Sequence, residues 1–140
     1  MSDVDNPSDE EIKRLLQQYR RVAVVGLSDR PDRPSHGVAA YLQRVGYEIT
    51  PVNPTITTTL GVPAVPDLQA VPPPVEIVDV FRRPEDVPPV AEGAIRVGAR
   101  VLWLQEGIVN EEAAARARAA GLTVVQDRCM LKEHRRLLGT

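Results

Sequence analysis

The sequence is poor in cysteine, histidine and aromatic residues. Among its 140 residues there is one cysteine, Cys129, and aromatic side chains make up only 4%. A single cysteine excludes an intramolecular disulfide and any zinc site built from several thiolates, and it fits a reducing compartment. The two histidines, His36 and His134, lie too far apart to form a spaced ligand pair, and His134 is expected on the surface of the last helix. No metal site is therefore predicted, and only sites made of carboxylates stay open.

The chain also lacks an excess of charge of one sign and any long hydrophobic run. Its 17 basic and 19 acidic residues give a net charge of -2, and the basic residues are scattered. Non-specific nucleic-acid binding requires a clear positive excess. The longest apolar runs, such as residues 22–27, are far shorter than the ~20 residues that cross a bilayer, and the N-terminus does not look like a signal peptide. We expect a cytoplasmic protein without a nucleic-acid partner and without membrane contact.

The composition is that of one folded domain. Hydrophobic residues make up 43% of the chain and charged residues 26%, which is ordinary for a globular protein. A chain of this length can bury one core of its own. We predict a single domain over residues 8–138, preceded by a flexible segment, residues 1–7.

Five segments have the apolar spacing or the capping residues of helices. Ser8 and Glu11 have the spacing of a capping box, and apolar residues follow at i, i+3, i+4 and i+7. Ser35 and Asn110 stand where helix N-caps are expected. Further helices are predicted over residues 35–45, 88–97, 110–120 and 130–138.

Short apolar runs alternate with these helices. The predicted strands are residues 22–26, 47–52, 75–81, 100–104 and 122–126. Residues 55–74, rich in threonine and proline, predict a loop with one short helical turn at 67–70. Strands that alternate with helices form right-handed crossovers and a parallel sheet. We therefore predict an α/β, three-layer Rossmann-like fold, in which helices cover both faces of a five-stranded parallel sheet.

In such folds ligands bind beyond the carboxyl ends of the strands. The loop after the first strand begins with Gly26, as in a dinucleotide-binding fingerprint, but Ser28 and Pro31 stand at the positions of the second and third glycines. The second strand ends at Asn53, where an NAD site usually offers a carboxylate to the ribose. Both departures argue against NAD.

The same loop carries Arg30 and Arg33 into the start of a helix. Guanidinium groups and the free N–H groups of a helix N-terminus can together hold a phosphate. Equally, Ser35 could only cap the helix while the arginines are solvated. The spacing alone does not decide between these two interpretations.

Two further strand ends carry candidate residues. Phe81 and Arg82 could contact an adenine face and a phosphate, or they could be a core and a surface residue. Residues 105–108 could approach a ligand or form a plain turn that needs glycine for a positive φ. Cys129, which begins the last helix, could approach a ligand thiol or serve as a small packing residue.

Taken together, these loops resemble the CoA-binding protein family, whose small domains are similar to the N-terminal domain of the succinyl-CoA synthetase α subunit. The resemblance covers about residues 8–138. Its specificity comes from several separate motifs in the right order. They are residues 24–28 with Pro31, 33–35, 46–47, 51–54, 78–82, 103–108 and 127–129.

The resemblance implies coenzyme A as the cofactor. The first loop would contribute its residues around the phosphates: Gly26, Leu27, Ser28, Arg33, Pro34 and Ser35. The next two strand ends would surround the adenosine portion: Asn53, Pro54, Val80, Phe81 and Arg82. The fourth loop would lie toward the pantetheine arm: Gln105, Glu106, Gly107 and Ile108.

We predict a protein that binds coenzyme A or acyl-CoA and senses, carries or presents it. The related synthetase also needs a catalytic histidine in a further domain and a partner subunit, neither of which this chain contains. No catalytic residue is assigned, so the sequence favours a binding module over an enzyme. The alternatives are an NAD(P)-dependent oxidoreductase or redox-sensing domain, and an interaction subunit with a vestigial pocket. The acyl group, any protein partner and the oligomeric state stay open.

Overall fold

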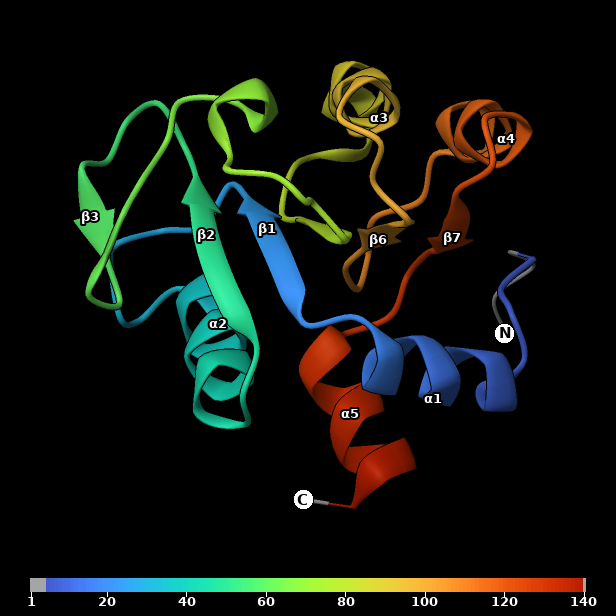
Figure 1. Ribbon diagram of the computed structural model, residues 1–140, viewed down its shortest axis with the longest axis horizontal. Helices are drawn as coiled ribbons and strands as arrows, with labels where there is room; N and C mark the ends of the chain where they lie inside the picture. Colours follow the sequence, from blue (N-terminus) through green and yellow to red (C-terminus); the bar gives the residue numbers. More distant parts are fainter. Residues whose placement is uncertain (1–4, 140) are drawn as a thin grey trace.

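The computed structural model describes residues 5–139 and has a parallel sheet at its centre (Figure 1). The sheet has five strands in the order β2-β1-β5-β6-β7, and every neighbouring pair is parallel. Each strand overlaps a predicted apolar run, and β1 begins one residue before the run predicted for it. The bounds are β1 Arg21–Val25, β2 Glu48–Val52, β5 Ile77–Val80, β6 Val101–Leu104 and β7 Thr123–Val125.

Helices cover both faces of the sheet, as Figure 1 shows. One face packs against α1 (Asp9–Gln18), α2 (Pro34–Arg44) and α5 (Met130–Leu138). The other face packs against α3 (Val87–Arg96) and α4 (Glu111–Ala119). The predicted three-layer α/β fold is thus confirmed. None of the helices in residues 5–139 is both long enough and apolar enough to cross a membrane.

The segment between β2 and β5 contains more structure than was predicted. The expected helical turn is present as a 3-10 helix, η1 (Leu68–Ala70). A small antiparallel hairpin of two-residue strands, β3 (Thr58–Thr59) and β4 (Val62–Pro63), was not predicted, since such short strands show no alternation of apolar and polar residues. Val65 then pairs with β2 through backbone hydrogen bonds to Pro51 and Asn53, so the segment is fastened beside the sheet edge. A second 3-10 helix, η2 (Pro84–Asp86), precedes α3.

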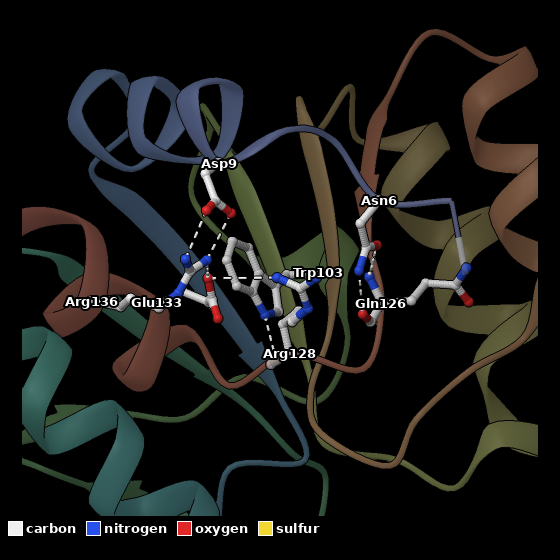
Figure 2. Close-up of polar contacts among 7 residues, drawn as sticks. All are labelled: Asn6, Asp9, Trp103, Gln126, Arg128, Glu133 and Arg136. Carbon is white, nitrogen blue, oxygen red and sulfur yellow. Dashed lines mark hydrogen bonds and ion pairs between the residues drawn. The ribbon is translucent and has the colours of Figure 1, made fainter. Parts of the chain in front are cut away.

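The start of the described chain is attached to the sheet at Asn6. The Asn6 side chain donates to the Gln126 carbonyl at 2.8 Å and accepts from the Gln126 N–H at 2.7 Å (Figure 2). We predicted a flexible segment over residues 1–7. This contact could not be read from the local sequence, because it joins residues 120 positions apart. Residues 1–4 lie outside the described residues.

The helix α1 is fixed in place by an ion pair with α5. Arg136 makes two hydrogen bonds of 2.8 Å with the Asp9 carboxylate and also contacts Glu133 (Figure 2). Beneath them the Trp103 indole N–H donates to the backbone carbonyl of Arg128 at 2.8 Å. These contacts hold the two helices against the same face of the sheet.

The strand order reverses between β1 and β5, which flank each other although α2, β2 and the hairpin separate them in sequence. The Gly26 N–H donates to Val52 at 2.9 Å and the Phe81 N–H donates to Val25 at 2.8 Å, so the ends of three strands are tied together. Gly26 has a φ of +87°, and a β-carbon on it would stand 2.2 Å from the Phe81 carbonyl oxygen. Only glycine fits this position.

One carboxyl group interrupts the apolar packing of the sheet. Asp79 alternates with Val78 and Val80 and so points to the face covered by α1, α2 and α5. It is fully buried, and its Oδ1 accepts from Gln105 Nε2 at 2.6 Å. Among the described residues its Oδ2 has no hydrogen-bond partner. Burial raises the pKa of Asp79 from 3.8 to about 7, against the opposing effect of the Gln105 hydrogen bond.

Replacing Gly26 by alanine is expected to destabilise the fold severely. The G26A variant adds a steric clash to the cost of a left-handed backbone, together roughly 3 kcal/mol or more. Gly98 offers a matched control, because its φ is +74° and, apart from its chain neighbours, no atom of residues 5–139 would lie within 4 Å of a β-carbon there. The G98A variant should lose only about 1 kcal/mol. Chemical denaturation of both variants measures the difference, and equal losses would contradict the close approach at Phe81.

The buried carboxyl predicts a pH-dependent stability. Because the pKa of Asp79 is higher in the folded than in the unfolded state, the folded protein binds the extra proton and loses stability as pH rises from about 4 to about 7. The Asp79→Asn variant removes this dependence. Relative to wild type it should gain free energy of unfolding over that window, by an amount on the order of a few kcal/mol. Urea unfolding at pH 5 and pH 8 tests this, and a difference that does not change with pH would contradict it.

Candidate functional site

Two adjoining pockets open at the carboxyl edge of the sheet, on either side of Arg82. We call them the polar pocket and the apolar pocket. The polar pocket has a volume of about 560 Å³ and is lined by Gly26, Ser28, Asp29, Arg30, Arg33, Pro34, Ser35, Asn53, Thr55, Ile56, Phe81 and Arg82. The apolar pocket has a volume of about 470 Å³ and is lined by Val25, Val52, Pro54, Pro66, Asp67, Leu68, Gln69, Arg82, Pro89, Val90, Gly93 and Arg96.

Side-chain hydrogen bonds fix the shape of the loop between β1 and α2. The Ser35 hydroxyl accepts from the Ser28 N–H, and the Ser28 hydroxyl accepts from the Arg30 N–H, both at 3.0 Å. Ser35 was expected to cap α2, and this prediction is wrong. The N-cap residue is Arg33, Pro34 occupies the first turn, and the Ser35 hydroxyl reaches back across the loop instead.

Asn53 fastens the same loop from the end of β2. Its side-chain N–H donates to the Leu27 carbonyl at 3.1 Å, while its Oδ1 accepts from both the N–H and the hydroxyl of Thr55. A carboxylate could not donate to Leu27. Asn53 therefore holds the loop in shape through these hydrogen bonds. It does not offer the carboxylate that an NAD site would use to bind the ribose.

The polar pocket is positively charged. The N-terminus of α2 faces it without a side-chain cap and without an acidic residue in its first turn. Arg33 and Arg82 line it, and neither forms an ion pair with any carboxylate of residues 5–139. Arg30 lies 3.6 Å from Asp32, both exposed, and Asp29 is the carboxylate in the lining. Such a pocket suits an anionic group.

Most of the predicted site residues meet around these pockets. Those in the polar pocket are Gly26, Ser28, Arg33, Pro34, Ser35, Asn53, Phe81 and Arg82. Pro54 and Arg82 line the apolar pocket. Leu27 and Val80 line neither pocket, because both side chains are fully buried in the core.

The loop at residues 105–108 lies outside both pockets. Gln105 is buried against Asp79, Glu106 is paired with Lys132 at 2.9 Å, and the Gly107 N–H donates to the Asp127 carboxylate at 2.7 Å. Gly107 has a φ of +81°, as a turn that requires glycine would have. The loop follows β6, and β5 separates it from β1 in the sheet. Its contact with a pantetheine arm stays a prediction.

The apolar pocket as a whole was not predicted from the sequence. Its floor is Val25 and Val52, and its walls come from the η1 segment and from α3. Residues 66–69 and 89–96 are far apart in sequence and carry no ligand motif, so only the fold brings them together. Arg96 is the charged residue that α3 contributes.

Cys129 and His134, at the start of α5 and within it, are both buried. Cys129 occupies the N-cap of α5, is 8% exposed and lines none of the pockets described, which agrees with the packing interpretation. His134 was expected on the surface, and this prediction is wrong. It is buried, its Nδ1 lies 2.7 Å from the Tyr41 hydroxyl, and burial lowers its pKa. Residues 5–139 contain no group of His, Cys, Asp and Glu side chains arranged to hold a metal ion.

Comparisons with known proteins agree with this arrangement. The family model for the CoA binding domain matches residues 20–135. The uncharacterized protein YneT of Bacillus subtilis is 52% identical over 131 residues, which are 94% of this chain and 97% of that protein. The solved structure of a hypothetical protein from Pyrococcus horikoshii is 39% identical, with a TM-score of 0.93 over 99% of this chain and 100% of that chain.

A larger protein has the same fold in one part. The dinucleotide-forming acetyl-coenzyme A synthetase 1 of Ca. Korarchaeum cryptofilum matches with a TM-score of 0.70 at 22% identity, over 80% of this chain and 27% of that chain. At this identity the likeness concerns the fold alone. The family match, in contrast, spans most of the sequence and confirms the resemblance of the motifs. This chain is therefore a member of the CoA binding domain family.

Proposed function

We propose that the protein binds coenzyme A or acyl-CoA in the cleft formed by the two pockets, and carries, senses or presents it without chemical change. Membership of the CoA binding domain family supports coenzyme A as the ligand class. The observation on which the proposal chiefly rests is the polar pocket, where unpaired arginines and the N-terminus of α2 face the same space. A diphosphate is the part of coenzyme A that such a pocket would bind.

The residues that line the two pockets fit the diphosphate and the adenosine of coenzyme A. Gly26 and Ser28 line the polar pocket at the end of β1, where the loop backbone borders the space that the diphosphate would occupy. Arg82 lines both pockets and so stands where the diphosphate and the adenosine would join. Apolar side chains dominate the adjoining pocket, as a site for an adenine ring requires.

The chemistry of the lining supports binding over catalysis. Among the residues that the structure describes, neither a histidine nor a cysteine lines the polar pocket. Its serines, Ser28 and Ser35, each accept a hydrogen bond from a loop N–H, and thus serve the shape of the loop. A nucleophile would need a base within hydrogen-bond reach, and the carboxylate in this lining, Asp29, is exposed.

Arg82 provides the test of the pocket. Replacing it by glutamine removes a charge-assisted hydrogen bond and should weaken coenzyme A binding by about 10- to 100-fold. The neighbouring Arg83 is the matched control, because it is exposed and pairs with Asp86 at 3.2 Å. Titration calorimetry with coenzyme A measures wild type, R82Q and R83Q, and R83Q should bind like wild type.

Three results would contradict the proposal. Equal affinities of R82Q and wild type would remove the cleft as the binding site. Tighter binding of NAD or NADP than of coenzyme A or acetyl-CoA would favour the oxidoreductase or redox-sensing alternative. A protein that binds none of these nucleotides at millimolar concentration would instead support an interaction subunit.

A further inference from the structure

The lining of the apolar pocket includes a positively charged side chain, that of Arg96. The pocket floor, Val25 and Val52, and its walls, which include Leu68 and Val90, are suited to a flat apolar ring. Yet Arg96 of the last turn of α3 also lines this pocket, opposite the segment that carries η1. A cation beside a ring-sized apolar space suggests a ligand that carries an anionic group next to its ring.

The position of Arg96 on α3 makes its lack of a partner informative. Glu92 stands four residues earlier on the same helix, which is the favourable spacing and order for an ion pair with Arg96. Glu92 instead pairs with Arg116 of α4, at 3.1 Å. Arg96 forms no ion pair with any carboxylate in the part of the chain that the structure describes.

The acidic residue in the pocket lining, Asp67, forms no ion pair with Arg96. Asp67 is the N-cap of η1, and its carboxylate accepts a hydrogen bond from the Ala70 N–H at 3.1 Å. Arg82, on the side shared with the polar pocket, likewise has no ion pair among the described residues. At Gly93 the helix α3 packs closely on η1, since a β-carbon there would lie 3.3 Å from Leu68 Cδ1. Arg82 and Arg96 thus line a pocket whose two walls are packed against each other at this point.

We propose that Arg96 determines specificity by binding a phosphate group on the ribose of the nucleotide, so that the cleft selects 3′-phosphorylated adenosine. This inference rests on the proposed function, in which the 5′-diphosphate occupies the polar pocket and the adenine occupies the apolar pocket. The ribose would then join them beside Arg82, and Arg96, which lines the same pocket as Arg82, is the cation that would meet a second phosphate on that ribose. Coenzyme A has this phosphate, whereas dephospho-CoA lacks it.

The experiment compares these two ligands by titration calorimetry. Wild type should bind coenzyme A about 10-fold or more tightly than dephospho-CoA, as expected for a charge-assisted contact with phosphate. In the Arg96→Gln variant this ratio should fall toward one, while the affinity for dephospho-CoA stays at the wild-type value. Since Arg96 is exposed, the wild-type ratio should also fall as salt is raised.

Arg100 provides the matched control. It is exposed and precedes β6, so it lies at the opposite edge of the sheet from the pockets. The Arg100→Gln variant loses the same charge and should keep the wild-type ratio. Adenosine 3′,5′-bisphosphate and adenosine 2′,5′-bisphosphate serve as probes without the pantetheine arm, and the 3′ isomer should bind more tightly to wild type but not to R96Q.

The outcomes separate this inference from the proposed function. If wild type binds coenzyme A and dephospho-CoA equally well, the role of Arg96 is overturned and coenzyme A binding stands. An equal weakening of both ligands in R96Q would also overturn it, because Arg96 would then act on the pocket as a whole. If neither ligand binds, the proposed function fails and this inference fails with it.

Discussion

The close contact between the ends of β1 and β5 is the constraint on which the rest of the site depends. At Gly26 the chain leaves the sheet with a positive φ, and the Phe81 carbonyl occupies the space that a side chain would fill. The same two residues extend the ladders on both sides of β1, through hydrogen bonds to Val52 and Val25. One loop then turns toward α2 and the other toward α3, because the strand order reverses at this point. The pockets lie between these diverging loops.

The loop that follows Gly26 is held rigid by polar side chains, so that the start of α2 faces the polar pocket. Ser35 and Asn53 each contribute a hydrogen bond to the loop backbone, at Ser28 and at Leu27. A pocket that is already formed avoids part of the entropy cost of binding. Arg33 and Arg82 line this pocket without an ion pair among the described residues. An anion can therefore bind to them without the cost of breaking an existing ion pair.

The sequence was sufficient to predict the fold, since each strand of the parallel sheet and each α-helix has a local signal. The apolar run before Gly26 and the capping residues Ser8 and Asn110 are examples, and both caps are present in the structure. The predicted loops around Gly26, Asn53 and Arg82 do meet, because the carboxyl ends of parallel strands share one edge. Their contact with coenzyme A is a matter for the binding experiments.

What could not be predicted depends on contacts between distant residues. Ser35 has the local signature of a helix cap, but its hydroxyl is used by Ser28. His134 lies on a helix with many charged residues, yet the packing of α5 against α2 buries it beside Tyr41. The local sequence of α3 does not distinguish Arg96 from other surface arginines. Arg96 is left without an ion pair among the described residues because Glu92 pairs with Arg116 of α4 instead. Asp79 is the one charged residue of β5, and its complete burial follows from the helices that cover both faces of the sheet.

The most direct measurement of the central claim is a titration of the isotope-labelled protein with coenzyme A, followed through the backbone amide resonances. If the reversal between β1 and β5 forms the binding cleft, the largest shifts will fall on residues 26–35, 53–56 and 81–83. The amides at the opposite edge, such as those of residues 20–21 and 99–100, will remain unchanged. Shifts centred on that opposite edge or on α4, or no shifts at millimolar coenzyme A, would contradict the claim.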